Sequence, residues 1–147
     1  MSGRKSLWKA CLEGDLEGAR AALGRGEGVD TTGEGSSTPL MVAVSYHHNS
    51  IVELLLTHNP PPDINRQDSQ DATVLHAACM RGNQWAVARL VALPNISLNT
   101  QNNQGGTPIM AAACSNHIDC VRQLARLAVV DLGLRDMRGR TAEDIAR

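Results

Sequence analysis

Short apolar segments with helical spacing occur in pairs along the chain. Near the N-terminus, Leu7, Ala10 and Cys11 lie on one helical face, and a second segment of the same kind follows after Gly14. Corresponding second segments occupy residues 51–56, 85–91 and 119–125. This pattern predicts an all-α chain built from pairs of short amphipathic helices.

The first helix of each pair begins with a recurring sequence. Residues 73–79 form its clearest copy, and the same frame returns at 38–44, 107–113 and 141–147, at spacings of 35, 34 and 34 residues. Each copy starts with a threonine, which can cap a helix N-terminus, and Pro39 and Pro108 suit the first helical turn. A fixed period in this range is typical of stacked structural repeats, so the sequence predicts an all-α repeat solenoid.

Two kinds of backbone turn are predicted from residue type. The residue that separates the helices of successive pairs is Gly14, His47, Gly82 and Asn116. Glycine adopts the left-handed backbone conformation freely, and Asn and His tolerate it better than most residues, so we expect that conformation at all four positions. Residues 68–71, 102–105 and 136–139 start with Asp or Asn and end with Gly or Asp, which is typical of β-turns.

This pattern resembles the ankyrin repeat, in which a turn and a Thr-Pro-Leu-His-x-Ala-Ala helix are followed by a second helix and a return loop. The resemblance covers residues 4–147 and implies helix-turn-helix units joined by β-hairpin-like loops. We expect a single domain with repeats at about 4–31, 32–65, 66–99 and 100–133, and a partial repeat at 134–147.

The sequence departs from the ankyrin pattern at the histidine that helps to join neighbouring repeats. Only His76 is present, and the other copies have Trp8, Met41, Met110 and Asp144 at this position. We therefore expect apolar packing to replace the polar network in the other repeats. The partial repeat also has only one predicted helix, which would leave apolar surface of the preceding repeat uncovered, so we expect the chain to be part of a longer protein.

Composition and charge narrow the range of functions. The hydrophobic content of 42% is enough for a buried core, and the net charge of −1 argues against binding to the phosphates of nucleic acids. The sequence shows no signal peptide and no apolar run of membrane-spanning length. Its four cysteines have no disulfide or zinc-binding spacing, so we expect reduced thiols and an intracellular location, in the cytoplasm or nucleus.

No group of residues indicates catalysis, a metal site or a cofactor site. The five histidines lack the spacing of helix-borne metal ligands, and Cys11 and Cys79 share a repeat position with Val44 and Ala113, which indicates a small buried position. The glycine-rich residues 24–28 lack the flanking strand and helix of a phosphate-binding loop. Cys114 falls one position after the small buried position in its repeat, and the sequence leaves the accessibility of its thiol open.

The resemblance implies a non-catalytic module that binds a protein or peptide on a concave face formed by the first helices and the loop tips. The partner-binding residues predicted from the repeat register are Glu13, Ser45, Tyr46, Gln70, Met80, Arg81, Gln104, Cys114, Ser115, Arg138 and Arg140. Tyr46, Met80 and Arg81 combine aromatic, flexible apolar and guanidinium groups, which are enriched at interfaces. We expect a monomer. The alternative is a structural spacer or targeting domain of a larger enzyme or membrane-associated protein.

Overall fold

The computed structural model describes residues 4–147, which form an all-α repeat solenoid without strands in this part of the chain. Its helices come in pairs joined by tight turns, and a short 3₁₀ segment, η1 (Glu34–Ser36), precedes the second pair. The helices are α1 (Leu7–Glu13), α2 (Leu16–Gly24), α3 (Pro39–Ser45), α4 (Asn49–Leu56), α5 (Val74–Arg81), α6 (Gln84–Val91), α7 (Pro108–Cys114), α8 (Ile118–Ala125) and α9 (Ala142–Ala146).

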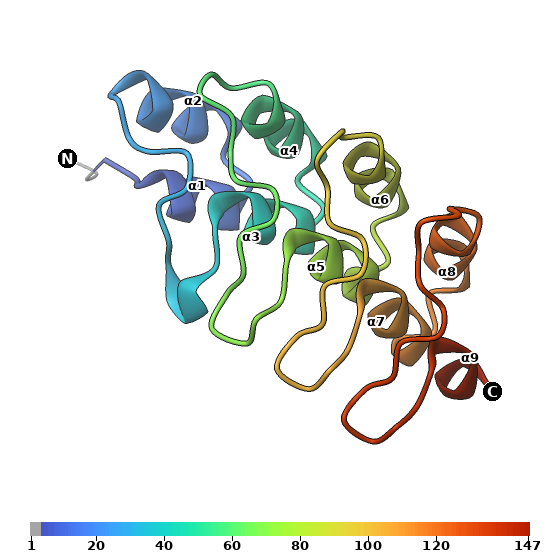
Figure 1. The fold of residues 1–147 in the computed structure, drawn as a ribbon. Coiled ribbons are helices and arrows are strands. Elements are labelled where there is room, and N and C mark those ends of the chain that lie inside the picture. The colour runs from blue at the N-terminus through green and yellow to red at the C-terminus, as the bar shows by residue number, and fades with distance from the viewer. Residues whose placement is uncertain (1–3) are drawn as a thin grey trace.

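The helices stack in two rows (Figure 1). The inner row contains α1, α3, α5, α7 and α9, and each of these helices packs against the next. The outer row contains α2, α4, α6 and α8, and long hairpin-shaped loops project from the inner row. None of these helices is both long enough and apolar enough to cross a membrane.

Threonine precedes α3, α5, α7 and α9, as the sequence predicts, and Ser6 takes this place before α1. The hydroxyl oxygens of Thr38, Thr107 and Thr141 each accept a hydrogen bond from the backbone N–H three residues later, at 3.2, 3.4 and 3.2 Å. Proline occupies the first helical position of α3 and α7. These caps satisfy N–H groups that have no partner inside the helix.

The predicted left-handed breaks are confirmed at all four positions. The φ angles are 74° at Gly14, 60° at His47, 66° at Gly82 and 60° at Asn116. A side chain at Gly82 would also meet the ring of His117, because a Cβ atom at this position would lie 2.5 Å from the Nδ1 atom of that ring.

The same relation holds between the first and second pairs, where a Cβ on Gly14 would lie 2.6 Å from the ring of His48. In the second pair the break residue is His47, and the position equivalent to His48 and His117 in the next pair is the smaller Asn83. The break residue is therefore glycine in the two pairs where an imidazole ring of the next pair packs against it, namely Gly14 facing His48 and Gly82 facing His117.

His76 joins its own repeat to the next hairpin. Its Nδ1 atom accepts a hydrogen bond from the backbone N–H of Thr73 at 3.1 Å, so Nε2 carries the proton and donates to the carbonyl of Gly106 at 2.9 Å. Met41 and Met110 occupy the equivalent positions and are 4% and 3% exposed, which confirms apolar packing there, although the sulfur of Met41 also accepts the backbone N–H of Thr38 at 3.5 Å.

The expectation of apolar packing is wrong for the other two replacements. The indole N–H of Trp8 donates to the hydroxyl of Ser37 at 3.0 Å, and this contact joins the first pair to the next hairpin. The carboxylate of Asp144 accepts the backbone N–H of Thr141 at 2.9 Å. A Trp ring has a polar N–H at its edge and a carboxylate can cap a helix, so both side chains make polar contacts in place of histidine.

Two series of hydrogen bonds connect successive loops. At the hairpin tips, the N–H groups of Ser69, Asn103 and Met137 donate to carbonyls of the preceding hairpin at 2.8, 3.0 and 2.9 Å. In the return loops, the side chains of Asn65 and Asn99 accept from backbone N–H groups of the following loop at 2.8 Å in both cases. These bonds fix the spacing between neighbouring repeats.

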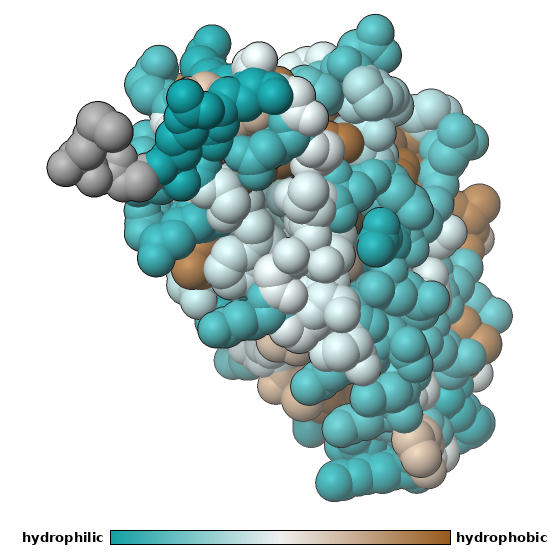
Figure 2. All heavy atoms as spheres, turned by 90° about the vertical axis from the view of Figure 1, so that its left-hand side faces the viewer, coloured by the Kyte–Doolittle hydropathy of each residue, from teal (hydrophilic) through white to brown (hydrophobic). Residues whose placement is uncertain are grey.

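The N-terminal end of the stack is polar. Lys5 pairs with Glu13 at 2.8 Å and with Asp15 at 2.9 Å. Figure 2 shows this end of the molecule, where hydrophilic and near-neutral residues predominate over hydrophobic ones. No helix pair covers this face within residues 4–147, and polar side chains can be exposed to water there at little cost.

The predicted small buried position is confirmed for three of its four residues. Cys11, Val44 and Cys79 are fully buried, and Ala113 is only partly buried. Ala113 differs because the helix that packs on α7 from the C-terminal side, α9, has no outer helix paired with it in residues 4–147.

We predict that His76 makes stability depend on pH. Burial lowers the pKa of His76 below its ordinary value of 6.5, so the unfolded chain binds the proton more readily than the folded chain. Stability should be full well above that value and should fall as the pH drops below it, by at most about 1.4 kcal/mol per pH unit.

Urea denaturation from about pH 7.5 to about pH 5.5 measures this dependence. The control is His76→Met, because methionine occupies the equivalent positions of α3 and α7. The variant lacks the buried imidazole, so it should show a flatter profile. Identical pH profiles would contradict the prediction.

We also predict that the residues at a break and at the facing ring position depend on each other. Gly82→Asn should destabilise the fold by about 1–3 kcal/mol, because the new side chain overlaps the ring of His117. His117→Asn in the same chain should restore most of that loss, since a break residue with a side chain would then face the smaller Asn, as His47 does with Asn83. A double-mutant cycle by urea denaturation tests this, and additive effects of the two substitutions would refute it.

Candidate protein-binding surface

A groove runs between the hairpins and the inner helices, and it contains two adjoining hollows. The first has a volume of about 150 Å³ and lies between α3, α5 and the hairpin that contains Asp68. The second has a volume of about 240 Å³ and lies between α5, α7, α9 and the next two hairpins. Met80 lines both hollows and is 50% exposed, so it forms the ridge between them.

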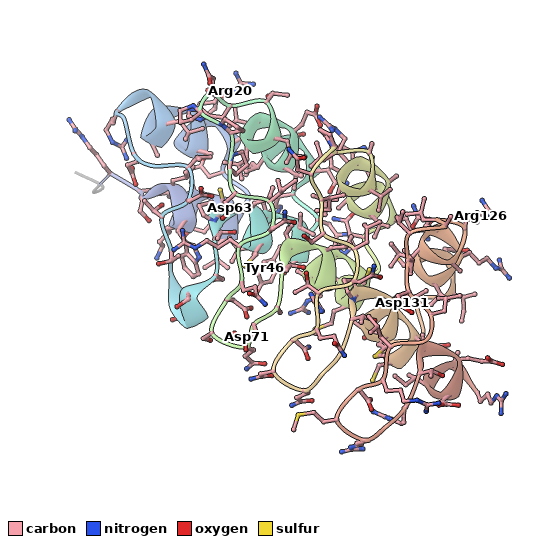
Figure 3. All side chains as sticks on the ribbon, in the orientation of Figure 1. Arg20, Tyr46, Asp63, Asp71, Arg126 and Asp131 are labelled. Atoms are coloured by element: carbon pink, nitrogen blue, oxygen red, sulfur yellow. The ribbon has the colours of Figure 1, made fainter. Side chains whose placement is uncertain are left out.

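Seven of the eleven residues predicted to bind a partner meet at this groove. Ser45 and Arg81 line the first hollow together with Met80, and the remaining lining residues of the second include Gln104, Cys114, Ser115 and Arg140. Tyr46, which is labelled in Figure 3, lies beside the groove, 52% exposed, with the guanidinium carbon of Arg81 5.9 Å from the centre of its ring. The repeat register thus identifies residues that are close in space.

Three of the predicted residues lie away from the hollows. Glu13 is paired with Lys5 at the N-terminal end of the stack. Gln70 and Arg138 are exposed at hairpin tips, and the carbonyl of Gln70 accepts the N–H of Asn103 at 3.0 Å. A partner that reaches the hairpin tips could contact Gln70 and Arg138, whereas Glu13 belongs to the polar end.

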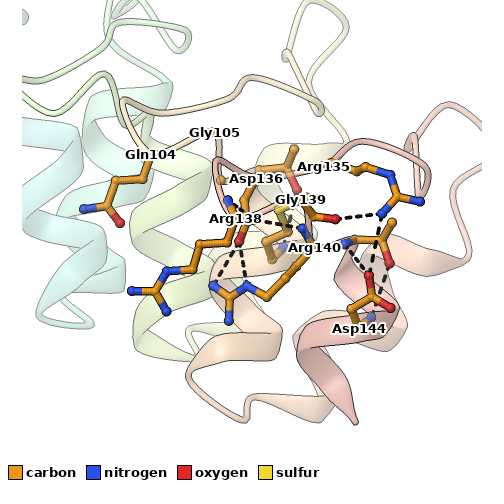
Figure 4. A network of polar contacts seen from close by, with 12 residues as sticks. Gln104, Gly105, Arg135, Asp136, Arg138, Gly139, Arg140 and Asp144 are labelled. Atoms are coloured by element: carbon orange, nitrogen blue, oxygen red, sulfur yellow. Dashed lines mark hydrogen bonds and ion pairs between the residues drawn. The ribbon is translucent and has the colours of Figure 1, made fainter.

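The charges beside the second hollow are partly neutralised. Arg140 forms an ion pair with Asp136 at 2.9 Å, within the network drawn in Figure 4. The backbone N–H of Arg140 also donates to this carboxylate at 2.9 Å, and these bonds lower the pKa of Asp136 below its ordinary value. Arg138 forms no ion pair with a carboxylate in the described part of the chain, so it is the more available cation of the two.

Several lining residues are absent from the sequence-based prediction. Met110, Ala111 and Ile145 form apolar walls of the second hollow, and Asp68 and His76 contribute to the first. The repeat pattern indicates Met110 only as a replacement for the buried histidine, and its 3% exposed surface faces the hollow. Ile145 lies on α9, and only the packing of α9 against α7 brings it to the groove.

The cysteine thiols of the core are poorly suited to nucleophilic catalysis. Burial raises the pKa of Cys11 to about 12 and raises the pKa of Cys79 further. A thiol in this state is protonated near neutral pH, whereas the thiolate is the reactive form. Cys120 is also buried, and Cys114 is the exposed cysteine.

The described residues also contain no cluster of side chains that is suited to bind a metal ion. No three His, Cys, Asp or Glu side chains of residues 4–147 come together in a way that could hold a metal ion.

Larger hollows of about 330 and 400 Å³ lie between the return loops. Their walls are mainly Leu, Ile, Pro and Asn, and they lack the Tyr, Arg and Met side chains of the groove.

Comparisons with known proteins agree with the repeat architecture. The family described as "Ankyrin repeats (3 copies)" matches residues 7–102, and the family described as "Ankyrin repeat" matches residues 104–136. The chain is 33% identical over 119 residues to "Probable E3 ubiquitin-protein ligase XBOS32" of Oryza sativa, covering 79% of this chain and 23% of that protein.

Two further relatives are also much longer than this chain. It is 32% identical over 98 residues to human "Rabankyrin-5", covering 67% of this chain and 8% of that protein. It is 36% identical over 88 residues to "Alpha-latrocrustotoxin-Lt1a" of Latrodectus tredecimguttatus, covering 60% of this chain and 6% of that protein. The chain thus spans less than a quarter of each of these three relatives.

We predict that a thiol reagent distinguishes Cys114 from the other cysteines. In the folded protein, Ellman's reagent should react rapidly with Cys114 and slowly with Cys11, Cys79 and Cys120, which are buried. All four should react in urea. Cys114→Ser should remove the rapid phase, and a rapid phase that persists in this variant would show that a core cysteine is accessible.

Proposed function

The chain belongs to the ankyrin repeat family, and on that premise we propose that residues 4–147 act as one non-catalytic domain that binds a protein or peptide partner. The binding site is the groove between the hairpins and the inner helices. The partner-contacting residues are those at or beside the two hollows, with Gln70 and Arg138 as additional contacts at the hairpin tips.

The observation that carries this proposal is the grouping of Tyr46, Met80 and Arg81 at the groove. Tyr46 and Met80 are large apolar side chains that are about half exposed, and Arg81 lies against the Tyr46 ring. Exposed aromatic, Met and Arg side chains beside a hollow are the usual anchors of protein interfaces. Packing of the stack does not require these side chains to be exposed, so their exposure supports a role in binding.

The rigidity of the stack supports binding as well. The hydrogen bonds between successive loops hold the hairpins at fixed spacing, so the groove walls are organised before a partner arrives. A preformed surface loses less conformational entropy on association. We propose that the domain is a monomer and works inside the cell, where its four cysteines would remain reduced.

A second candidate function is a spacer or targeting domain within a larger protein. Its support is that the chain corresponds to only 6% to 23% of three relatives. Under that proposal the groove would be unnecessary, because the stack itself would set the distance between other parts of the protein.

We predict that Tyr46→Ala combined with Arg81→Glu abolishes partner capture. The first substitution removes an anchor and the second reverses the charge beside the first hollow, so retention of specific partners should fall at least about tenfold. Affinity capture from cell lysate with quantitative mass spectrometry measures this loss.

The matched control is Trp85→Ala combined with Arg122→Glu, which makes the same kind of changes on the outer helices α6 and α8. Trp85 is 40% exposed and the Arg122 side chain is 68% exposed, so the fold should tolerate both. Capture should survive in the control. Equal capture by both double variants and the wild type would refute binding in the groove and favour the spacer.

A further inference from the structure

One buried imidazole connects the walls of the two hollows. His76 is 1% exposed and belongs to the wall of the first hollow. Its Nε2–H donates to the carbonyl of Gly106, which lines the second hollow together with Asn102 and Gln104 of the same hairpin. The ring therefore holds the hairpin of residues 99–106 on α5, and a change in the ring affects both hollows.

The contacts of this ring fit its neutral form. Nδ1 accepts the backbone N–H of Thr73 at 3.1 Å, whereas both nitrogens of a protonated imidazole are donors. The hydroxyl oxygen of Thr73 lies 3.0 Å from Nδ1 and can accept the added proton. The backbone N–H of Thr73 would then have lost its acceptor in a residue that is 2% exposed. Protonation of His76 thus breaks a buried contact at the start of α5.

The helices and the hairpin around His76 provide no free carboxylate for a positive charge. Neither α3 nor the hairpin of residues 99–106 contains an ionisable side chain, and α7 contains only Cys114. The charged side chain of α6, Arg89, forms an ion pair with Glu53 of α4 at 2.8 Å. A protonated ring is therefore unfavourable in its buried position.

The first hollow offers the protonated ring a better place. Asp68 lines this hollow with His76, and the charge of Asp68 favours protonation of the ring. Asp68 accepts the N–H groups of Gln70 and Ala72 through Oδ1 at 2.8 and 3.0 Å, which leaves Oδ2 for an imidazolium N–H. Arg81 lines the same hollow and adds a like charge, so the ring should turn toward Asp68.

We propose that His76 is a pH-sensitive switch of the groove. The neutral ring holds the hairpin of residues 99–106 in place and leaves the first hollow open. The protonated ring leaves Thr73 and Gly106 and turns into the first hollow toward Asp68, which fills this hollow and frees a wall of the second. The consequence for a partner rests on the proposed function, because the partner would bind in the same groove.

The direction of the switch follows from the burial of the ring. Burial lowers the pKa of His76 below its ordinary value of 6.5, and a ring that has turned into the hollow beside Asp68 has a higher pKa. The neutral arrangement is thus fully favoured well above pH 6.5. Its population relative to the turned-out arrangement decreases as the pH falls below that value, by at most about tenfold per pH unit.

NMR of the ¹⁵N-labelled chain tests the switch without a partner. At pH 7.5, the imidazole spectrum should show His76 with the proton on Nε2. Between about pH 7 and pH 5.5, the Thr73 amide should lose at least about tenfold of its protection from hydrogen exchange, after correction for the intrinsic rate. The internal control is the amide of Thr38, which donates to the sulfur of Met41 and should show no such loss.

Two variants locate the effect. His76→Met should remove the pH dependence at the Thr73 amide. Asp68→Asn retains an Oδ1 acceptor for the turn and should move the titration of His76 to lower pH, because the ring no longer meets a carboxylate. A Thr73 amide that stays protected while His76 is protonated, or a His76 titration that is unchanged by Asp68→Asn, would overturn the proposal. Circular dichroism checks that both variants are folded.

The effect on binding is measured with proteins captured from cell lysate at pH 7.5 and then washed at pH 5.5. Among proteins whose capture depends on Tyr46 and Arg81, the wild type should release at least about tenfold more than His76→Met. Equal release from both chains, or retention on both, would refute the control of the groove by His76. If no capture depends on Tyr46 and Arg81, the proposed function fails, and the NMR results still decide whether His76 switches.

Discussion

Each helix pair of this protein can bury its apolar side only against the pairs next to it in the sequence. Leu7, Leu40 and Leu75 are almost completely buried, and the inner helices that carry them pack α1 on α3 and α3 on α5. Since no single pair encloses a core, stability depends on repeating one interface with the same geometry. This requirement explains why a threonine precedes α3, α5, α7 and α9 and why a left-handed break follows α1, α3, α5 and α7.

Apolar packing is not directional, so it cannot by itself set the distance and angle between repeats. Hydrogen bonds between hairpin tips and between return loops provide that definition, and they use backbone groups or short Asn side chains. The side chains at the His76 position vary more freely. His76 and Trp8 reach the next hairpin by different polar atoms, whereas Met41 contributes apolar contact. The loop hydrogen bonds therefore allow one position to change while the stack is maintained.

The sequence predicts the backbone features of each repeat and the residues that the register aligns at the groove, but it does not predict side-chain contacts between repeats. Threonine caps and the left-handed conformation at Gly82 follow from local backbone chemistry, so residue type is sufficient. The contact of His117 with Gly82, the bond from Trp8 to Ser37 and the neutralisation of Arg140 require knowledge of what faces each side chain. For the groove, the register locates Tyr46, Met80 and Arg81, but it misses Ile145 because the pattern indicates α9 only as part of an incomplete repeat.

Tyr46 and Met80 can differ in chemistry from the residues at their positions in other repeats because the stack does not depend on their side chains. Tyr46 and Met80 are half exposed, and neither takes part in the hydrogen bonds that connect the loops. The shape of the groove, in contrast, does depend on the stack: the walls of the second hollow come from three successive inner helices and the hairpins between them. Any change in the spacing between repeats changes the distance between the hollows. Under the proposed function, side-chain identity at the groove would set the chemistry of recognition, and the repeated interface would set the shape that a partner must match.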